Sequence, residues 1–219
     1  MPLLDLTTDE LLTTTRAVRK RLDYDRPVDD ADIRDCVRIA MQSPSGSNSM
    51  TMQFVVVQDE AKREKIGDIY RQCFDIYKSM DGVYAGSIVK DTPAEQEQQD
   101  RVATSADYLG QTMGQAPALV IACTASGRVD GASGMIAAST MGNVLPAMWS
   151  FMLAARARGL GTAWTTVGLM MEQEIADVVG IPFDEVQQVC LSPIAHTKGT
   201  DFKQAMRPDP DTIIHWDNW

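Results

Sequence analysis

The segment Arg16-Ala17-Val18-Arg19-Lys20-Arg21 places four cations within six residues near the start of the chain. About one helix length later follows Ser43-Pro44-Ser45-Gly46-Ser47-Asn48, a loop of small residues that offers hydroxyl groups and backbone N–H donors. Because the chain as a whole carries a formal net charge of -10, a basic cluster here indicates a local site for an anion. Together the two segments predict a site for a phosphate-bearing cofactor with a polar ring.

The composition is that of an ordinary globular protein. The chain has 219 residues, of which 44% are hydrophobic and 23% charged, which is enough to bury a sizeable core. No internal repeat or domain boundary is visible, so we expect a single domain over residues 1–219. The excess of 30 acidic over 20 basic residues repels polyanions, and we therefore expect no nucleic-acid partner.

Several features predict a cytoplasmic protein that does not enter the membrane. The four cysteines form no C-x-x-C pair and lie in apolar surroundings, so they are expected to be reduced and buried. The N-terminus begins Met1-Pro2-Leu3-Leu4-Asp5 without the basic and apolar regions of a secretion signal. Residues 131–155 lack any charge, but their many small residues, Asn143 and Pro146 favour a helix that is buried all round over a membrane span.

The expected helices follow from periodicity and capping signals. Thr7-Thr8-Asp9-Glu10 predicts a capping box that starts a first helix, with Arg16 and Arg19 on one side near its end. Further helices are expected from Val28 to Ser43-Pro44, through Ile66 to Tyr77, up to about Gly114, through the uncharged stretch to Gly159, and over Glu172–Val179.

Strands are expected at Met52–Val57, which should be buried on both faces, and at Pro117–Thr124, Thr162–Val167 and Val186–Ala195. Residues 81–101 are polar and resemble an exposed lid. The tail 196–219, with both histidines, looks like an arm that needs something to pack on. Helices and strands alternate, with long helices between few strands, which predicts a mixed central sheet surrounded by helices.

Common catalytic motifs are absent from the sequence. Gly159-Leu160-Gly161 follows a helix and has Trp164 where a dinucleotide fingerprint needs glycine. There is no phosphate-binding P-loop and no G-x-S-x-G nucleophile elbow. His196 and His215 have no metal-ligand spacing and are interpreted as surface or interface side chains. We therefore expect no metal site, and no obligatory catalytic acid or base.

Four features, taken in order, resemble the FMN-dependent nitroreductase family over almost the whole chain. They are the basic segment, the Ser43–Asn48 loop, the segment Ala154-Ala155-Arg156-Ala157-Arg158-Gly159-Leu160-Gly161-Thr162, and a C-terminal Arg207. The resemblance implies an α+β, nitroreductase-like fold and a homodimer that holds FMN at its interface. It also implies that the C-terminal arm, residues 197–219, crosses to the partner subunit.

The resemblance also assigns the cofactor-binding residues. It places Arg16, Ala17, Val18 and Arg19 around the FMN phosphate and ribityl chain, with Arg207 as a second cation. Guanidinium groups suit a phosphate because they form paired charge-assisted hydrogen bonds. From the partner subunit, Pro44, Ser45, Gly46, Ser47 and Asn48 would reach the ring and ribityl region. The backbone amides of Thr165, Thr166 and Val167 would approach the flavin N5 and O4 atoms.

Three departures from the family pattern stand out. Ala17 replaces a serine that the family often has between its basic residues, Met50-Thr51-Met52 replaces Gln-Pro-Trp, and Trp149-Ser150 replaces Gln-Asn in the long helix. Cofactor binding should survive these changes, whereas the substrate pocket should be unusual.

The activity implied by the resemblance is reduction of a small-molecule acceptor, such as a nitroaromatic or a quinone, with NADH or NADPH as the co-substrate. Two alternatives remain open at this point. One is a specialised flavin reaction of the same fold, either reductive dehalogenation or flavin cleavage. The other is a flavin-binding or storage protein without turnover. The sequence names neither the acceptor nor the preferred nucleotide.

Overall fold

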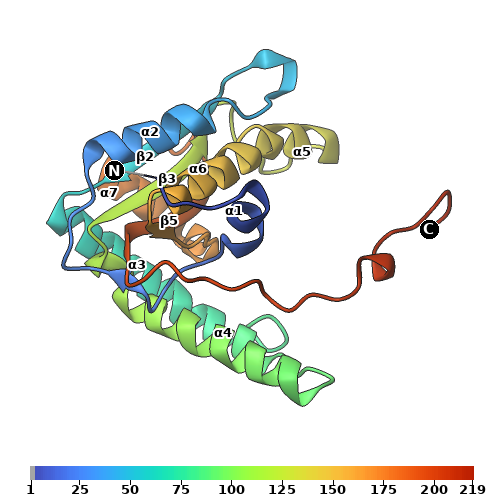
Figure 1. Ribbon diagram of the computed structural model, residues 1–219. Helices are drawn as coiled ribbons and strands as arrows, with labels where there is room; N and C mark the ends of the chain where they lie inside the picture. Colours follow the sequence, from blue (N-terminus) through green and yellow to red (C-terminus); the bar gives the residue numbers. More distant parts are fainter. Residues whose placement is uncertain (1–2) are drawn as a thin grey trace.

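The computed structural model describes residues 3–219 (Figure 1). Its α-helices are α1 (Thr8–Thr14), α2 (Asp30–Ala40), α3 (Glu60–Lys78), α4 (Pro93–Thr112), α5 (Gly134–Gly142), α6 (Leu145–Ala157) and α7 (Glu172–Val179). Its strands are β1 (Leu22–Asp23), β2 (Met52–Val57), β3 (Ala118–Thr124), β4 (Leu160–Thr162) and β5 (Gln187–Thr197). The short 3-10 helix η4 (Val167–Met171) precedes α7.

The strands form one antiparallel sheet. Its order is β1-β5-β3-β2, and β4 pairs with β5 beside this path. Every pairing between named strands is antiparallel. Within residues 3–219 the expected mixed sheet therefore reduces to one parallel contact, an isolated bridge between Ala17 and Thr162.

The sheet is the middle of three layers (Figure 1). Strand β3 is buried throughout, and its side chains alternate between the two faces because successive residues of a strand point to opposite sides. Val120 and Ala122 join the core formed with α2 and α6, whereas Leu119 and Ile121 join the core formed with α3, α4 and α7. The helices thus cover both faces of the sheet, and the α+β prediction is confirmed.

The cysteine prediction is also confirmed. All four are unpaired and buried in the cores, at Cys36, Cys73, Cys123 and Cys190.

The first helix is shorter than predicted. The capping box of Thr7 and Glu10 is present, but α1 ends at Thr14 and the backbone is extended at Thr15. Thr13, Thr14 and Thr15 follow one another and each donates its hydroxyl to the carbonyl four residues earlier, and such β-branched residues weaken a helix. Placing Arg16 and Arg19 on this helix was therefore wrong, because both lie in the extended segment that follows it.

The prediction that Met52–Val57 is buried on both faces was also wrong. Strand β2 has correct bounds, but it is the edge of the sheet and pairs only with β3 among the described strands. Gln53 and Val56 are exposed, with Val56 at 37%. An apolar run is typical of a central strand, and here the extra apolar residues instead line a surface groove described below.

The long uncharged helix is in fact two helices. It breaks between α5 and α6, where Pro146 stands in the first turn of α6 and cannot continue a preceding helix. Helix α6 is largely buried, as expected. Helix α5 is not, since Met135 is 78% and Ile136 51% exposed.

Other boundaries also differ. Helix α4 already begins at Pro93 through a capping box of Thr92 and Glu95, so only the first part of 81–101 is loop. Residues 162–167 were expected to be one strand, but β4 ends at Thr162 and Thr165 makes only an isolated bridge to Leu191. His196 is a buried residue of β5, not part of the arm. The arm itself extends away from the body with little regular structure (Figure 1).

None of the helices described in residues 3–219 is both long and apolar enough to cross a membrane.

Candidate cofactor site

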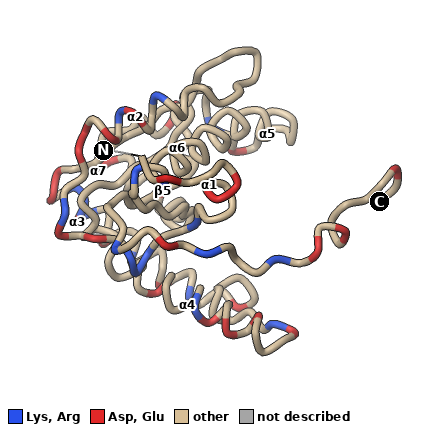
Figure 2. The backbone as a smooth tube through the Cα atoms, in the orientation of Figure 1, with Lys and Arg blue, Asp and Glu red and all other residues tan. Residues whose placement is uncertain are grey.

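A polar cleft of about 500 Å³ lies between the extended segment after α1, helix α4 and the first part of the arm. It brings together three predicted arginines that are far apart in the sequence. Its lining consists of Arg16, Ala17, Arg19, Gln98, Arg101, Val102, Ser105, Gln204, Ala205 and Arg207. Figure 2 shows basic segments on both the arm and α4.

The predicted arginines of the cleft keep their charge uncompensated. Arg16 donates from Nη1 to the carbonyl of Lys203 at 3.0 Å, and Arg207 donates to the carbonyl of Met206 at 3.2 Å. Arg19 donates to Ser105 Oγ at 3.2 Å. Within residues 3–219, none of these three arginines forms an ion pair with a carboxylate. The cleft therefore suits an anionic group.

Tyr70 links this arginine cluster to the segment that follows β4. Burial lowers the pKa of Arg19, and the nearby Tyr70 and Tyr77 oppose that effect. Burial also raises the pKa of Tyr70 to about 12, against the influence of Thr165 and Arg19. The Tyr70 side chain thus lies close to both Arg19 and Thr165, and the two predicted groups of cofactor residues are neighbours in this chain.

The amides of the Thr165–Val167 segment are not equally available. The Thr165 amide donates to the Leu191 carbonyl at 3.0 Å, and its hydroxyl donates to the same oxygen at 2.6 Å. This amide is already engaged within the sheet, so the amides left for the expected contacts with the flavin are those of Thr166 and Val167. Thr166 is exposed and Val167 begins η4, where the first N–H groups of a helix have no partner within it.

Ala17 and Val18 have structural roles. Ala17 lines the cleft and bridges to Thr162. The Val18 amide donates to the Thr162 carbonyl at 2.8 Å, and its side chain packs with Leu22 and Ala195 in a small core. These contacts fix the extended backbone that carries Arg16 and Arg19.

The Ser43–Asn48 loop lies elsewhere in the chain, at the junction of α5 and α6. The Gly46 amide donates to Asn143 Oδ1 at 2.6 Å, and the hydroxyls of Ser43 and Ser150 lie 2.9 Å apart. Ser47 and Asn48 both have a φ of 54°, a left-handed backbone that non-glycine residues seldom adopt. In Figure 1 this loop projects on the side of the molecule away from α4, so one chain does not unite it with the cleft.

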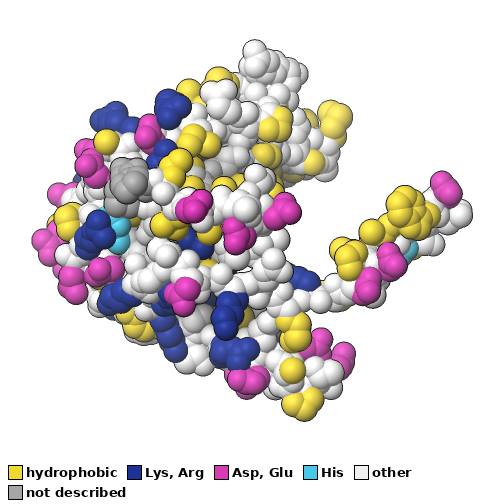
Figure 3. Space-filling model, viewed as in Figure 1, with side chains coloured by type: hydrophobic (Ala, Val, Ile, Leu, Met, Phe, Trp, Pro, Cys, Tyr) yellow, Lys and Arg dark blue, Asp and Glu magenta, His cyan; other side chains and the backbone are white. Residues whose placement is uncertain are grey.

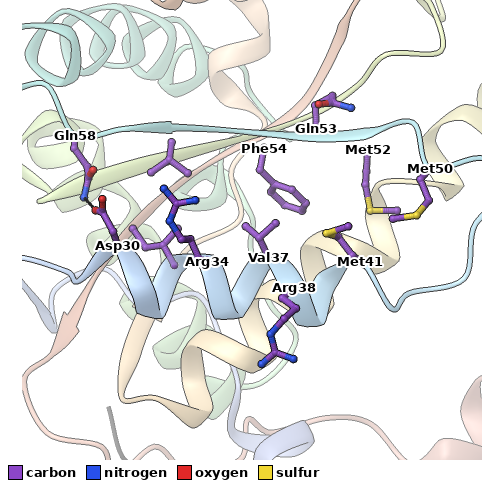
Figure 4. A pocket seen from close by; sticks show the side chains of 12 residues that line it. Asp30, Arg34, Val37, Arg38, Met41, Met50, Met52, Gln53, Phe54 and Gln58 are labelled. Carbon is purple, nitrogen blue, oxygen red and sulfur yellow. Dashed lines mark hydrogen bonds between the residues drawn. The ribbon is translucent and has the colours of Figure 1, made fainter.

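A second cavity, of about 830 Å³, is a groove between α2 and the edge strand β2 (Figure 4). Val37, Met41, Met50, Met52 and Phe54 give it an apolar floor, and charged residues of α2 stand at its rim. Two of these methionines belong to the departures from the family pattern. None of the predicted cofactor residues lines this groove.

The sequence interpretation missed the contribution of α4. Gln98, Arg101, Val102 and Ser105 line the cleft and recur at the spacing of one helix face. This periodicity was the signal that could have found them. It was obscured because residues 81–101 were interpreted as an exposed lid.

The described part of the chain gives little support for a metal site or for a nucleophilic cysteine. Residues 3–219 hold no group of three or more His, Cys, Asp or Glu side chains placed to share a metal ion. Burial raises the pKa of Cys36, Cys123 and Cys190 to about 12, so these thiols are poor nucleophiles.

Solved structures share the fold of this chain. Oxidized iodotyrosine deiodinase bound to FMN and 3-iodo-L-tyrosine has a TM-score of 0.70 and 18% identity, covering 97% of this chain and 100% of that one. An FMN and NADPH-dependent nitroreductase variant from Sphigopyxis sp. strain HMH has a TM-score of 0.68 and 20% identity, covering 98% and 100%. A BluB-like flavoprotein from Clostridium difficile 630 has a TM-score of 0.66 and 18% identity, covering 96% and 99%.

No curated protein matches the chain by sequence. The sequence pattern described as "Nitroreductase family", in contrast, matches residues 12–196. This range contains the extended basic segment, the Ser43–Asn48 loop, the α4 wall of the cleft and the five strands except the last residue of β5. The chain therefore belongs to the nitroreductase family.

Proposed function

We propose that this protein is an FMN-dependent oxidoreductase that takes electrons from NADH or NADPH and passes them to a nitroaromatic or quinone. The observation that carries the proposal is the cleft in which Arg16, Arg19 and Arg207 meet without a carboxylate partner among residues 3–219. In a chain of net charge -10, leaving three cations unpaired in one cleft favours an anionic ligand.

The residues present fit FMN. A phosphate monoester carries close to two negative charges and accepts several hydrogen bonds, which matches convergent guanidinium groups. The segment that carries Thr166 and Val167 lies near the cleft through Tyr70, so one chain offers donors for both ends of such a molecule. When bound, FMN supplies the hydride-accepting chemistry that none of the protein side chains provides.

The role of the protein would be to bind FMN, orient it and shield it. Arg16, Arg19 and Arg207 hold the phosphate, and the amides of Thr166 and Val167 direct hydrogen bonds toward the ring edge. The tyrosines of α3 pack beneath the site, since Tyr70 is buried in the core and the partly buried Tyr77 packs against it. The four unpaired, buried cysteines suit the reducing cytoplasm that we propose for it.

A homodimer would complete the site with the partner's Ser43–Asn48 loop. The arm supports this proposal, because its residues Ile213 and Trp216 are 72% and 81% exposed. Figure 3 shows hydrophobic side chains on the extension that leaves the body. Large apolar side chains in such a position favour burial against another surface. The groove between α2 and the unpaired edge of β2 offers one, with apolar side chains and free strand hydrogen-bonding groups.

The direct test is to purify the protein, identify its bound flavin after denaturation, and assay it with NADH and NADPH against nitroaromatics and quinones. An iodinated tyrosine belongs in the same panel, because the fold is shared with iodotyrosine deiodinase. We expect a yellow protein that releases FMN rather than FAD and oxidises one of the nucleotides. A colourless protein that FMN does not reconstitute would overturn the proposal.

The same assay distinguishes this enzyme from the main alternative that is not an enzyme, a flavin-storage protein. A flavin-storage protein would release FMN but would not oxidise either nucleotide with any acceptor in the panel.

A further inference from the structure

Helix α4 presents a polar stripe to the arginine cleft. Gln98, Arg101, Val102 and Ser105 are spaced at three and four residues, so they share one helix face, and all four line the cleft. The opposite wall carries Arg16 and Arg19, and the arm contributes Arg207. The cleft thus lies between a helix and two extended segments.

Arg101 adds a fourth guanidinium to this cleft. Its one ion pair among the described residues is with Glu97 on the same helix, and the two side chains are 63% and 73% exposed. Exposed pairs of this kind contribute little to stability, so Arg101 can leave Glu97 for a stronger partner at small cost. No aspartate or glutamate is among the described residues that line the cleft.

Ser105 connects the two walls. Its hydroxyl accepts a hydrogen bond from Arg19 Nη1 at 3.2 Å and donates to the Val102 carbonyl at 2.9 Å. Arg19 is half-buried between α4 and the tyrosines of α3. A guanidinium held in this way loses less freedom when it binds an anion, because its orientation is already fixed.

We infer that Arg101 binds the phosphate monoester of the bound flavin and that Ser105 positions Arg19 for the same group. This inference rests on the proposed function, since it assumes that the cleft holds FMN. Helix α4 is then one wall of the phosphate site and not only a support for the preceding loop. The terminal phosphate is the favoured group because all four guanidinium groups line one compact polar cleft.

The test measures Kd for FMN and for riboflavin, which lacks the phosphate, by flavin fluorescence quenching with protein stripped of cofactor. The variants are Arg101→Ala, Arg101→Lys, Ser105→Ala and Ser105→Thr. Arg71→Ala is the matched control, because Arg71 also pairs with an acidic residue of its own helix, Asp68 on α3, and does not line the cleft. The Michaelis constants for NADH and NADPH are measured with the same variants.

We expect Arg101→Ala to raise the Kd for FMN about tenfold, at the low end for a charge-assisted hydrogen bond, and to leave riboflavin unchanged. Arg101→Lys should recover part of the loss because it keeps the charge. Ser105→Ala should raise the Kd for FMN about threefold, and Ser105→Thr should restore it. Arg71→Ala should match the unaltered protein.

The flavin-binding measurements distinguish a failure of the proposed function from a failure of the inference about α4. If the unaltered protein binds neither flavin, the proposed function fails. If it binds FMN better than riboflavin but Arg101→Ala changes nothing, or weakens both flavins equally, the inference about α4 is wrong and the proposed function stands. A rise confined to the Michaelis constant for NADPH would assign Arg101 to the nucleotide and would also overturn the inference.

Discussion

Arg16 and Arg207 come from opposite ends of the chain and meet at one cleft, where each donates to a backbone carbonyl and neither pairs with a carboxylate of the described residues. Replacing either with alanine should weaken FMN binding by about 1.5–3 kcal/mol, the usual effect of removing a hydrogen bond to a charged group. Fluorescence titration of the stripped protein measures this directly. Arg71→Ala is a suitable control, since Arg71 is exposed, pairs with Asp68 on its own helix and does not line the cleft. Unchanged affinity in both variants would remove these arginines from the site.

The buried His196 predicts a loss of stability in mild acid. Burial is the main cause that lowers its pKa from the ordinary 6.5, Arg26 acts in the same direction, and the Pro27 carbonyl, Asp32 and Asp23 oppose it. Since the folded state then binds the proton less readily than the unfolded state, its full contribution is present above pH 6.5 and is lost as the pH falls below that value. The free energy of unfolding should therefore decrease from about pH 7.5 to about pH 5.5.

Chemical denaturation of the unaltered protein and of His196→Gln at several pH values tests this. The variant should show a flatter pH dependence whatever its absolute stability. Equal slopes in the two proteins would show that other groups cause the effect.

Single residues also show the reach of sequence reasoning at the site. The meeting of Arg16, Arg19 and Arg207 was predictable only from the family pattern, because nothing local in the sequence brings the arm to the N-terminal segment. Arg101 and Ser105 carried a helical spacing that could have been noticed. The Thr165 amide could not be judged from the sequence, because its acceptor is the carbonyl of Leu191, which is far along the chain.

At the level of helices and strands, local signals were reliable and long-range ones were not. The capping box at Thr7, and the glycines after α6 and α7, predicted helix ends that the structure has, with positive φ at Gly159 and Gly180. The end of α1 and the break before α6 depend on Thr13–Thr15 and Pro146, whose effects on a helix were underweighted. The edge position of β2 depends on strand order, which an apolar run does not specify.

The capping box of α4 offers a test of how the helix beside the cleft is anchored. Thr92 accepts from the Glu95 amide, and Glu95 accepts from the Thr92 amide and hydroxyl. Thr92→Ala should destabilise the first turns of α4 by about 1 kcal/mol. Hydrogen exchange should accelerate there and not in α3. Thr104→Ala is the matched control, because Thr104 is an exposed threonine inside the same helix. Equal acceleration in the two variants would show that the box has no special role.

For the whole molecule, the arm and the apolar surface of α5 are the features that a single chain leaves unexplained. Deleting residues 208–219 removes Ile213 and Trp216 but keeps Arg207. If these side chains pack on a second subunit, the deletion should lower the thermal midpoint, the FMN occupancy and the fraction of dimer together, because partner and cofactor both stabilise the native state. The double variant Asp209→Asn and Asp211→Asn keeps the apolar side chains and should behave like the full chain. Light scattering that gives a monomer with FMN bound would contradict the dimer.

The proposed function leads to a kinetic prediction for the complete enzyme. Hydride transfer requires close approach to the reacting atom, so a nucleotide and an acceptor that share one open face of the site must occupy it in turn. Parallel double-reciprocal plots, the pattern of ping-pong exchange, should result. Rapid mixing of the cofactor-loaded protein with the preferred nucleotide alone should bleach its yellow colour, and adding a nitroaromatic should restore it. The control is the same mixing without nucleotide, which should leave the colour unchanged. Converging lines, or bleaching that requires both substrates, would mean that the two bind side by side, and the acceptor would then need a second pocket formed with the partner subunit.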